Sequence, residues 1–342
     1  MAKGIDWETR IGRRLRLRDL HAFFVVAQAG SMAKAAAQLG VSQPAVSEVI
    51  ADLEQTLRVR LFDRSPRGVQ PTIYGRALLA RTLTVFDELK QGVRDLEFLA
   101  DPTAGEVRIG CPESIAAAFL PPVLLRFMDE HPGIVVDVKQ VVTPTLELPE
   151  LRARTLDFVV ARIVTSPVPK LSDDLDLEVL FEDELVLAAG LQSRWARRRK
   201  LELAELVSAN WLLTSADTWN LLRVEEAFRA SRLDMPKVIL TTFSVHLRTH
   251  LLAARDFVTA LPRSVVELNA ARFGLKMLPV QLPNRPWPVA IVTLKNRTLS
   301  PVVQLFIEHL RAFTKTMIRP RGRWPAEERD LSRSGAIRAR SG

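Results

Sequence analysis

The sequence predicts an α+β multidomain protein with a small helical head, one long linking helix and a two-lobed α/β body. Three observations support this prediction. Two short helical patterns joined by a tight turn occupy residues 33–53. Apolar residues three, four or seven positions apart run through residues 72–99, which indicates a single long helix. From residue 106 onward, short apolar strands alternate with helical patterns, as in α/β domains.

The head contains two helices whose ends are marked by local signals. Gly40 can adopt the left-handed conformation that ends the first helix. Ser42 is expected to cap the second helix, and Pro44 falls in its first turn, where a missing N–H is tolerated. The face of the first helix that is expected to meet a neighbour consists of Ala33, Ala36 and Ala37. The buried stripe of the second helix is expected to consist of Val46, Val49, Ile50 and Leu53.

The second helix leaves polar side chains exposed near its start, the end that a recognition helix presents to the major groove of DNA. Gln43 can contact adenine through two hydrogen bonds, Ser47 can bond to a base or a phosphate, and the Pro44 ring can touch a thymine methyl. Glu48 can accept a hydrogen bond from cytosine. Ser42 is a further candidate, although capping explains this residue equally well.

The segments that flank these helices offer hydroxyl and cationic groups to DNA. Ser31 is expected to cap the first helix of the pair. Residues 60–70 have the pattern of a two-stranded wing with Arg64 and Arg67 at its tip, and both arginines are candidates for phosphate or minor-groove contact. The predicted DNA-binding domain is residues 17–72, preceded by a basic extension over residues 1–16.

The long helix, residues 73–100, has an apolar seam that favours pairing with a second chain. This seam is expected to consist of Leu79, Leu83, Phe86, Val93 and Leu96, interrupted by Lys90. Because an isolated helix has no domain of its own to cover it, a homodimer is expected, with two heads side by side. Packing of the helix against its own body is the alternative.

The body is expected to span residues 104–317 as two lobes with a cleft between them. The first lobe is expected to hold residues 104–164 and 270–317, the second residues 165–269, and residues 318–342 read as a disordered basic tail. The expected strands are 106–110, 134–142, 157–162, 185–189, 238–242, 257–261, 276–282 and 289–295. The expected helices are 114–131, 146–155, one after residue 218, one after residue 244, and 301–316.

Composition limits the classes of protein that fit. Residues 1–100 contain fifteen Lys and Arg against eleven Asp and Glu, and residues 317–342 contain seven against three. Basic ends suit a polyanion, although a solvated surface explains charge alone equally well. The chain has no run of eighteen apolar residues and does not start with a signal-peptide pattern, so we expect a cytoplasmic protein without a membrane partner.

Cysteine and histidine give little sign of redox or metal chemistry. Cys111, the single cysteine, is expected to be a small buried apolar residue rather than a redox switch. Among the histidines only His246 and His250, four apart, have a metal-ligand spacing, and their turn offers no carboxylate partner. We therefore expect neither a metal ion nor a cofactor.

From about residue 17 to residue 316, the chain resembles the LysR-type transcriptional regulators. In the head, the resemblance is carried by residues 22–24, Ala27, 30–31, 35–36, Leu39, 41–47, 53–54, 61–64 and Gly75. In the body, it is carried by residues 109–110, 120–121, Phe127, 131–133, 156–157 and 261–262. Glu48 departs from this pattern, because the family often has Arg or Lys there.

The resemblance implies a winged helix-turn-helix, a dimerising linker helix and an effector domain similar to a type 2 periplasmic binding protein. It also implies double-stranded DNA and a small-molecule effector as partners, and homodimers that pair into homotetramers. RNA polymerase is a further candidate partner.

Several hydroxyl side chains and one arginine are candidates for effector binding. Ser114, Thr145, Thr218 and Ser244 each stand at an expected helix start facing a strand end, where free N–H groups suit an anion. Plain capping is the alternative for each hydroxyl. Arg162 ends a strand beside the crossing between lobes, where it can pair with a carboxylate or phosphate of a ligand, or with an acidic neighbour.

Three other classes of protein compete with a regulator. An enzyme with a DNA-binding head lacks support, because we find no serine elbow, phosphate loop or paired-carboxylate motif. A solute-binding protein is disfavoured by the absent export signal. A ligand-independent, nonspecific architectural DNA-binding protein is the third alternative, and competition with random duplex separates it from a regulator.

Overall fold

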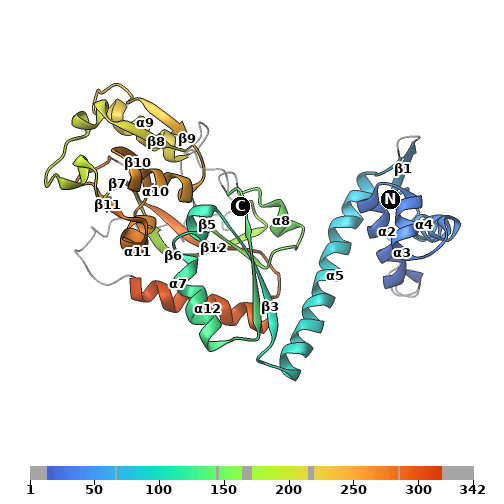
Figure 1. Ribbon diagram of the computed structural model, residues 1–342. Helices are drawn as coiled ribbons and strands as arrows, with labels where there is room; N and C mark the ends of the chain where they lie inside the picture. The colour runs from blue at the N-terminus through green and yellow to red at the C-terminus, as the bar shows by residue number, and fades with distance from the viewer. Residues whose placement is uncertain are drawn as a thin grey trace, which may run out of the picture.

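The computed structural model describes residues 14–65, 68–143, 146–163, 172–214, 219–283 and 286–317. Figure 1 shows a helical head and a two-lobed body joined by the long helix α5 (Ile73–Ala100). The order of elements confirms the predicted α+β architecture. No helix in these ranges is long and apolar enough to cross a membrane.

The head is a helix-turn-helix followed by a two-stranded wing, as predicted. Its elements are α2 (Leu17–Ala29), α3 (Met32–Leu39), α4 (Gln43–Leu57), β1 (Phe62–Ser65) and β2 (Gly68–Pro71). Gly40 ends α3 with a φ of 67°, in the left-handed region that favours glycine. Phe23 and Ile50 are fully buried in the core between the three helices.

The buried face of α3 differs from the expected one. Met32, Ala35 and Ala36 are buried, whereas Ala33 and Ala37 are exposed, because the helix turns a neighbouring stripe toward α2 and α4. In α4, three of the four expected residues are buried, and Val49 lies half-buried at the edge of the stripe. The three-helix core is therefore shifted by about one residue along α3.

Helix α5 packs against its own chain along one side, so the predicted seam is divided. Thr72 caps the helix through its side chain. Leu79 packs on the core of the head, and the Phe86 ring lies 5.8 Å from the His21 ring and 6.3 Å from the Phe24 ring. Of the remaining seam residues, Leu83 is half-buried and Val93 and Leu96 are exposed.

The first lobe is a five-stranded mixed sheet in the order β4-β3-β5-β12-β6. Strands β3, β4 and β5 are parallel, and β12 runs antiparallel to both β5 and β6. The strands are β3 (Gly105–Cys111), β4 (Ile134–Gln140), β5 (Phe158–Arg162), β6 (Leu175–Asp183) and β12 (Trp287–Leu294). The helices are α6 (Glu113–Ala116), α7 (Leu120–Glu130), α8 (Pro149–Arg152) and α12 (Pro301–Met317).

The second lobe is a five-stranded sheet in the order β11-β7-β10-β8-β9. Its strands are β7 (Leu185–Gly190), β8 (Asn210–Leu213), β9 (Val238–Thr241), β10 (Phe257–Pro262) and β11 (Leu275–Met277). Its helices are η2 (Arg194–Arg197), η3 (Leu203–Ser208), α9 (Trp219–Ala230), α10 (Val245–Ala254) and α11 (Arg263–Phe273). Trp211 and Phe228 are fully buried between its layers.

The chain crosses between the lobes at other points than expected. Strand β6 pairs with β12 in the first sheet, and β11 pairs with β7 in the second. The crossings therefore lie between Asp183 and Leu185 and between Met277 and Trp287, rather than at residues 165 and 270. Strands β6 and β8 and helix α11 were not expected.

Two expected helices are shorter than their sequence patterns. The pattern over residues 114–131 is divided into α6 and α7, because Pro121 and Pro122 fit only the first turn of a helix. The pattern over residues 146–155 yields only one turn, since Leu148 and Arg154 have positive φ values on either side of it. Arg67, Thr145, Thr218 and the segments 1–13 and 318–342 lie outside the described residues.

Candidate functional site

The start of α4 offers polar side chains to solvent, as predicted for a recognition helix. Gln43, Pro44 and Glu48 are exposed at this end, and Ser47 beside them is half-buried. Ser42 accepts a hydrogen bond at its Oγ from the Ala45 N–H at 3.4 Å, so its hydroxyl acts as a cap. This end of the helix is available to a partner.

Ser31 and Arg64 lie in the segments that flank α4. The Ser31 Oγ accepts from the Lys34 N–H at 3.5 Å and caps α3. Arg64 is exposed on the first strand of the wing.

Sequence reasoning missed the residue that holds the wing against α4. The Glu54 carboxylate accepts hydrogen bonds from the Leu61 N–H at 2.7 Å and the Phe62 N–H at 3.2 Å. Because these N–H groups begin β1, Glu54 fixes the angle between α4 and the wing. Glu54 and Leu61 are seven residues apart, so no local sequence pattern indicated this contact.

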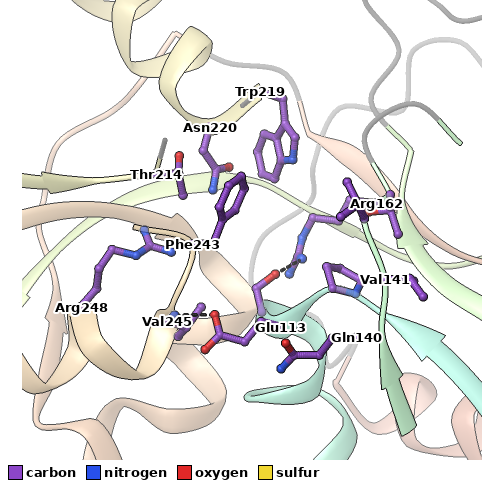
Figure 2. A pocket seen from close by; sticks show the side chains of 14 residues that line it. Glu113, Gln140, Val141, Arg162, Thr214, Trp219, Asn220, Phe243, Val245 and Arg248 are labelled. Carbon is purple, nitrogen blue, oxygen red and sulfur yellow. Dashed lines mark hydrogen bonds between the residues drawn. The ribbon is translucent and has the colours of Figure 1, made fainter. Parts of the chain in front are cut away.

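A cleft of about 330 Å³ lies between the two lobes of the body (Figure 2). From the first lobe it is lined by Pro112, Glu113, Ser114, Gln140, Val141, Val142, Thr143 and Arg162. From the second lobe it is lined by Thr214, Trp219, Asn220, Phe243, Val245 and Arg248. Its position agrees with the expected cleft between lobes, and two of the predicted site residues, Ser114 and Arg162, are in its wall.

Arg162 is buried in the wall of the cleft and already has a carboxylate partner. Its Nη2 lies 3.2 Å from Asp183 Oδ2, and its Nη1 donates to Ser114 Oγ at 2.7 Å. Ser264 donates to the same Asp183 oxygen at 2.6 Å. Burial lowers the pKa of Arg162, and the charge of Asp183 opposes this shift. Arg162 thus has the acidic neighbour named as the alternative to a ligand.

The N-terminus of α10 holds a carboxylate from the opposite lobe. Glu113 Oε2 accepts from the Val245 N–H at 2.6 Å, and Oε1 accepts from Ser244 Oγ at 3.3 Å and from the His246 N–H at 3.4 Å. The Ser244 hydroxyl also caps the helix, accepting from the Leu247 N–H at 3.2 Å. The anion-binding character expected at Ser244 is therefore used within the chain, in a bond that joins the lobes.

Arg248, which sequence reasoning missed, is the second arginine of the cleft. It is 2% exposed, and its Nη1 donates to Ala260 O at 3.1 Å and Thr259 Oγ1 at 3.4 Å. Its Nε has no hydrogen-bond partner among the described residues. Burial lowers its pKa to about 10, against the opposing charge of Glu113. The only sequence signal was an arginine on the buried face of α10, between Val245 and Leu252.

Cys111 lies at the end of β3 and is completely buried. Burial raises the pKa of its thiol to about 12, although the charge of Arg162 acts in the opposite direction. The thiolate is the reactive form of cysteine, so this side chain behaves at neutral pH as a small apolar group.

Comparison with known proteins adds the family to this geometry. The family described as "LysR substrate binding domain" matches residues 100–315, and "Bacterial regulatory helix-turn-helix protein, lysR family" matches residues 17–76. The chain belongs to the LysR family of transcriptional regulators. This LysR-type regulator combines a DNA-binding helix-turn-helix with an effector-binding domain.

Its relatives share nearly the whole length of the chain. The HTH-type transcriptional regulator GbpR of Azospirillum brasilense is 29% identical over 90% of this chain and 89% of its own. The uncharacterized regulator YdcI of Escherichia coli K12 is 29% identical over 87% of this chain and 96% of its own. Both are named as transcriptional regulators, as is the family, and neither is named as an enzyme.

Solved structures show the same fold. A full-length variant of OxyR from Pseudomonas aeruginosa has a TM-score of 0.60 at 21% identity, covering 88% of this chain and 95% of its own. Full-length CbnR, solved in complex with its target DNA, has a TM-score of 0.56 at 21% identity, covering 87% of this chain and 99% of its own.

Proposed function

We propose that this LysR-type regulator binds a specific DNA site as a homodimer or homotetramer and responds to a small anionic effector in the interlobe cleft. The observation that carries the effector class is the presence, in one cleft, of a buried arginine and a helix N-terminus that already binds a carboxylate. The arginine is Arg248, whose Nε has no partner among the residues that the structure describes. Both groups lie in the wall of one cleft. Arg248 and the α10 N–H groups favour an anion for the same electrostatic reason.

Glu113 defines how such an effector changes the protein. Its carboxylate bonds to two N–H groups and one hydroxyl at the start of α10. A carboxylate or phosphate of the effector takes the place of Glu113 at these donors and gains the charge of Arg248. Release of Glu113 breaks a direct bond between the lobes, so effector-bound and effector-free proteins differ in lobe geometry. A ligand shifts such an equilibrium only through unequal affinity for the two states.

The experiment is a thermal-shift screen of the full-length protein against small carboxylates, phosphates, neutral sugars and amines. A ligand that binds only the folded form raises the melting temperature. We expect stabilisation by members of the anionic set. Arg248→Gln should abolish that shift, and Glu113→Gln should enlarge it, because the internal competitor loses its charge.

Arg152→Gln is the matched control, because Arg152 is half-exposed, pairs with Asp174 and lies outside the cleft wall. Its response to the anionic set should equal that of the unmodified protein. Stabilisation by neutral sugars or amines alone, or an anion response that survives Arg248→Gln, would contradict the proposed effector class.

The DNA-binding part of the proposal rests on the exposed start of α4. The residues proposed to contact base edges are Gln43, Pro44, Ser47 and Glu48, and those proposed to contact phosphates are Arg64 and Arg67. Competition between the chain's own upstream promoter DNA and a random duplex tests specificity. A regulator should prefer its own site by several kcal/mol, whereas an architectural protein binds both equally.

A further inference from the structure

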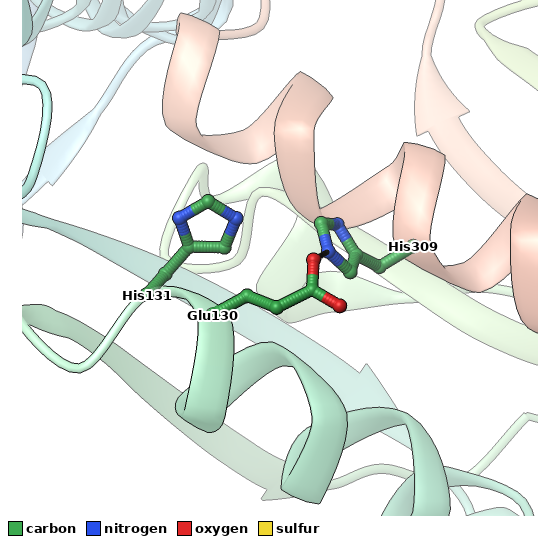
Figure 3. Close-up of side chains that lie close together, drawn as sticks. All are labelled: Glu130, His131 and His309. Atoms are coloured by element: carbon green, nitrogen blue, oxygen red, sulfur yellow. Dashed lines mark hydrogen bonds and ion pairs between the residues drawn. The ribbon is translucent and has the colours of Figure 1, made fainter.

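Three side chains with metal-ligating atoms meet on the first lobe, away from the cleft. Glu130 and His131 stand at the end of α7, and His309 projects toward them from α12 (Figure 3). One ligand atom from each residue lies within 4.8 Å of the others. The sequence separation between α7 and α12 concealed this cluster, and only His246 and His250 had a ligand spacing.

The hydrogen bonds of His309 fix which ring nitrogen is free. Nδ1 lies 2.9 Å from the Leu305 carbonyl oxygen, and a carbonyl only accepts, so Nδ1 carries the proton. In the neutral ring Nε2 is then an acceptor, and it lies 3.0 Å from Glu130 Oε2, which is also an acceptor. Two acceptors at this separation require a proton or a cation between them. A metal-ligating histidine commonly donates its other N–H to a carbonyl in this way.

The surroundings favour a cation. Arg126 holds Oε1 at 2.8 Å, so Oε2 remains directed at His309. His131 caps the C-terminal end of α7, where the helix dipole stabilises positive charge. The Phe127 ring packs at 4.9 Å from the His131 ring and 5.0 Å from the His309 ring, which positions both imidazoles.

We propose that Glu130, His131 and His309 bind a divalent transition-metal ion of the zinc class. Two imidazoles and one carboxylate are a donor set that zinc accepts, with water completing a tetrahedral site. The ion ties the end of α7 to α12, the helix that packs on the core of the first lobe. This site differs from the expected absence of a metal and is independent of the effector proposal.

The test uses full-length protein stripped with a chelator and titrated with Zn²⁺ and, separately, Co²⁺. We expect a rise in melting temperature with Zn²⁺ and a Co²⁺ absorption spectrum typical of nitrogen and oxygen ligands. Glu130→Gln and His309→Gln should each weaken binding by about tenfold or more, the scale on which changes in metal surroundings act. Glu130 is exposed, so its variant reports on the metal without disturbing the core.

The matched control is the double variant His246→Gln/His250→Gln, which removes the exposed pair on α10. It should keep the Zn²⁺ response of the unmodified protein. The proposal is overturned if the chelated protein binds neither metal, or if binding is lost in this double variant and retained in Glu130→Gln. In the first case the cluster is an imidazolium–carboxylate ion pair.

Discussion

The two arginines that line the cleft have different partners. This difference indicates that one arginine stabilises the fold and that the other is available to bind a ligand. Arg162 and Asp183 are both buried and form an ion pair. Arg248 donates to the neutral oxygens of Thr259 and Ala260, and its Nε has no partner in the described chain. Breaking a buried ion pair is costly, so a paired arginine and its carboxylate both matter for the stability of the fold. A buried arginine with an unsatisfied N–H is instead stabilised when an anion binds to it.

Arg162→Gln should therefore destabilise the body rather than only alter effector binding. It leaves Asp183 buried without its cation, for which the expected cost is about 3–5 kcal/mol. Urea unfolding followed by tryptophan fluorescence measures the loss. Arg152→Gln, in a partly exposed pair with Asp174, should cost about 1 kcal/mol or less. Equal midpoints for the two variants would contradict the structural role of Arg162.

Gln43→Ala should reduce discrimination between sequences more than overall affinity. A good bidentate base contact contributes about 1–3 kcal/mol of discrimination, whereas a phosphate contact contributes similarly on any sequence. The measurement is fluorescence anisotropy on promoter DNA and random duplex at several salt concentrations. Arg64→Ala serves as the comparison and should weaken both duplexes and lower the salt dependence. Equal losses for Gln43→Ala on both duplexes would count against a base contact.

At the scale of elements, the linker helix is attached to the body through buried charges. Arg297 is fully buried and binds Asp87 of α5 with both Nε, at 2.8 Å, and Nη2, at 3.0 Å. Arg154 binds the same carboxylate. Arg297 also donates to the Leu156 carbonyl oxygen at 2.6 Å, in the loop that precedes β5. The orientation of α5 is thus coupled to the first lobe through Asp87, in addition to the ion pairs of Arg94 with Asp157 and Glu106.

Asp87→Asn should loosen the linker helix from the body. Arg297 would remain buried but would lose the negative charge of Asp87. The expected loss in the free energy of unfolding is about 3–5 kcal/mol. Hydrogen exchange of the α5 amides should accelerate, while exchange in the second lobe stays unchanged. Unaltered protection of α5 would show that the remaining contacts, including the ion pairs of Arg94 with Asp157 and Glu106, hold the helix without Asp87.

Low pH should also loosen α5 from the body. Burial would raise the pKa of Asp87, but hydrogen bonds and charges of Arg297 and Arg154 outweigh it and lower the pKa. The stabilisation is therefore complete above the ordinary aspartate pKa of about 4 and is lost as the pH falls through the lower folded value. Exchange of α5 measured between neutral and strongly acidic pH should rise only in that low range, and a rise near neutral pH would contradict the assignment.

The elements set by local signals were predictable from the sequence, and those set by distant contacts were not. Gly40, Ser42 and Pro44 marked the ends of α3 and α4 through capping and backbone preference alone. Phe86 packs on the head because the fold brings α2 against α5, which periodicity cannot show. The bond from Glu113 to α10 joins residues more than 130 positions apart, so the cleft could be expected but not its internal carboxylate.

At the scale of the whole molecule, α5 leaves an apolar stripe free for a second chain. The stripe comprises Val85, Leu89, Val93 and Leu96, which are 39%, 48%, 54% and 67% exposed. Spacings of four, four and three residues place these side chains on one face of the helix, separate from the buried Asp87 and Gln91. This face can form the dimer contact. It shares Val93 and Leu96 with the seam predicted from the sequence, and its other residues differ.

The double variant Leu89→Glu/Val93→Glu should therefore shift the protein from dimer toward monomer. Charges on the stripe oppose burial against an identical stripe, where like charges meet. Analytical ultracentrifugation measures the mass in solution. Glu88→Lys, an exposed change on the same helix but beside the stripe, should leave the mass unchanged. A double variant with the mass of the unmodified protein would place the dimer contact elsewhere.

The carboxylate of Glu113 also has a consequence for sensitivity. Since it is part of the polypeptide, its local concentration at α10 is constant however dilute the protein or the signal becomes. Under the proposed competition, an anionic effector binds α10 only by displacing this carboxylate, so the effector concentration needed for a response is set by the strength of the internal bond. Because Glu113 lines the cleft, the isosteric change Glu113→Gln would then lower the effector concentration needed for a response while nearly preserving the shape of the pocket.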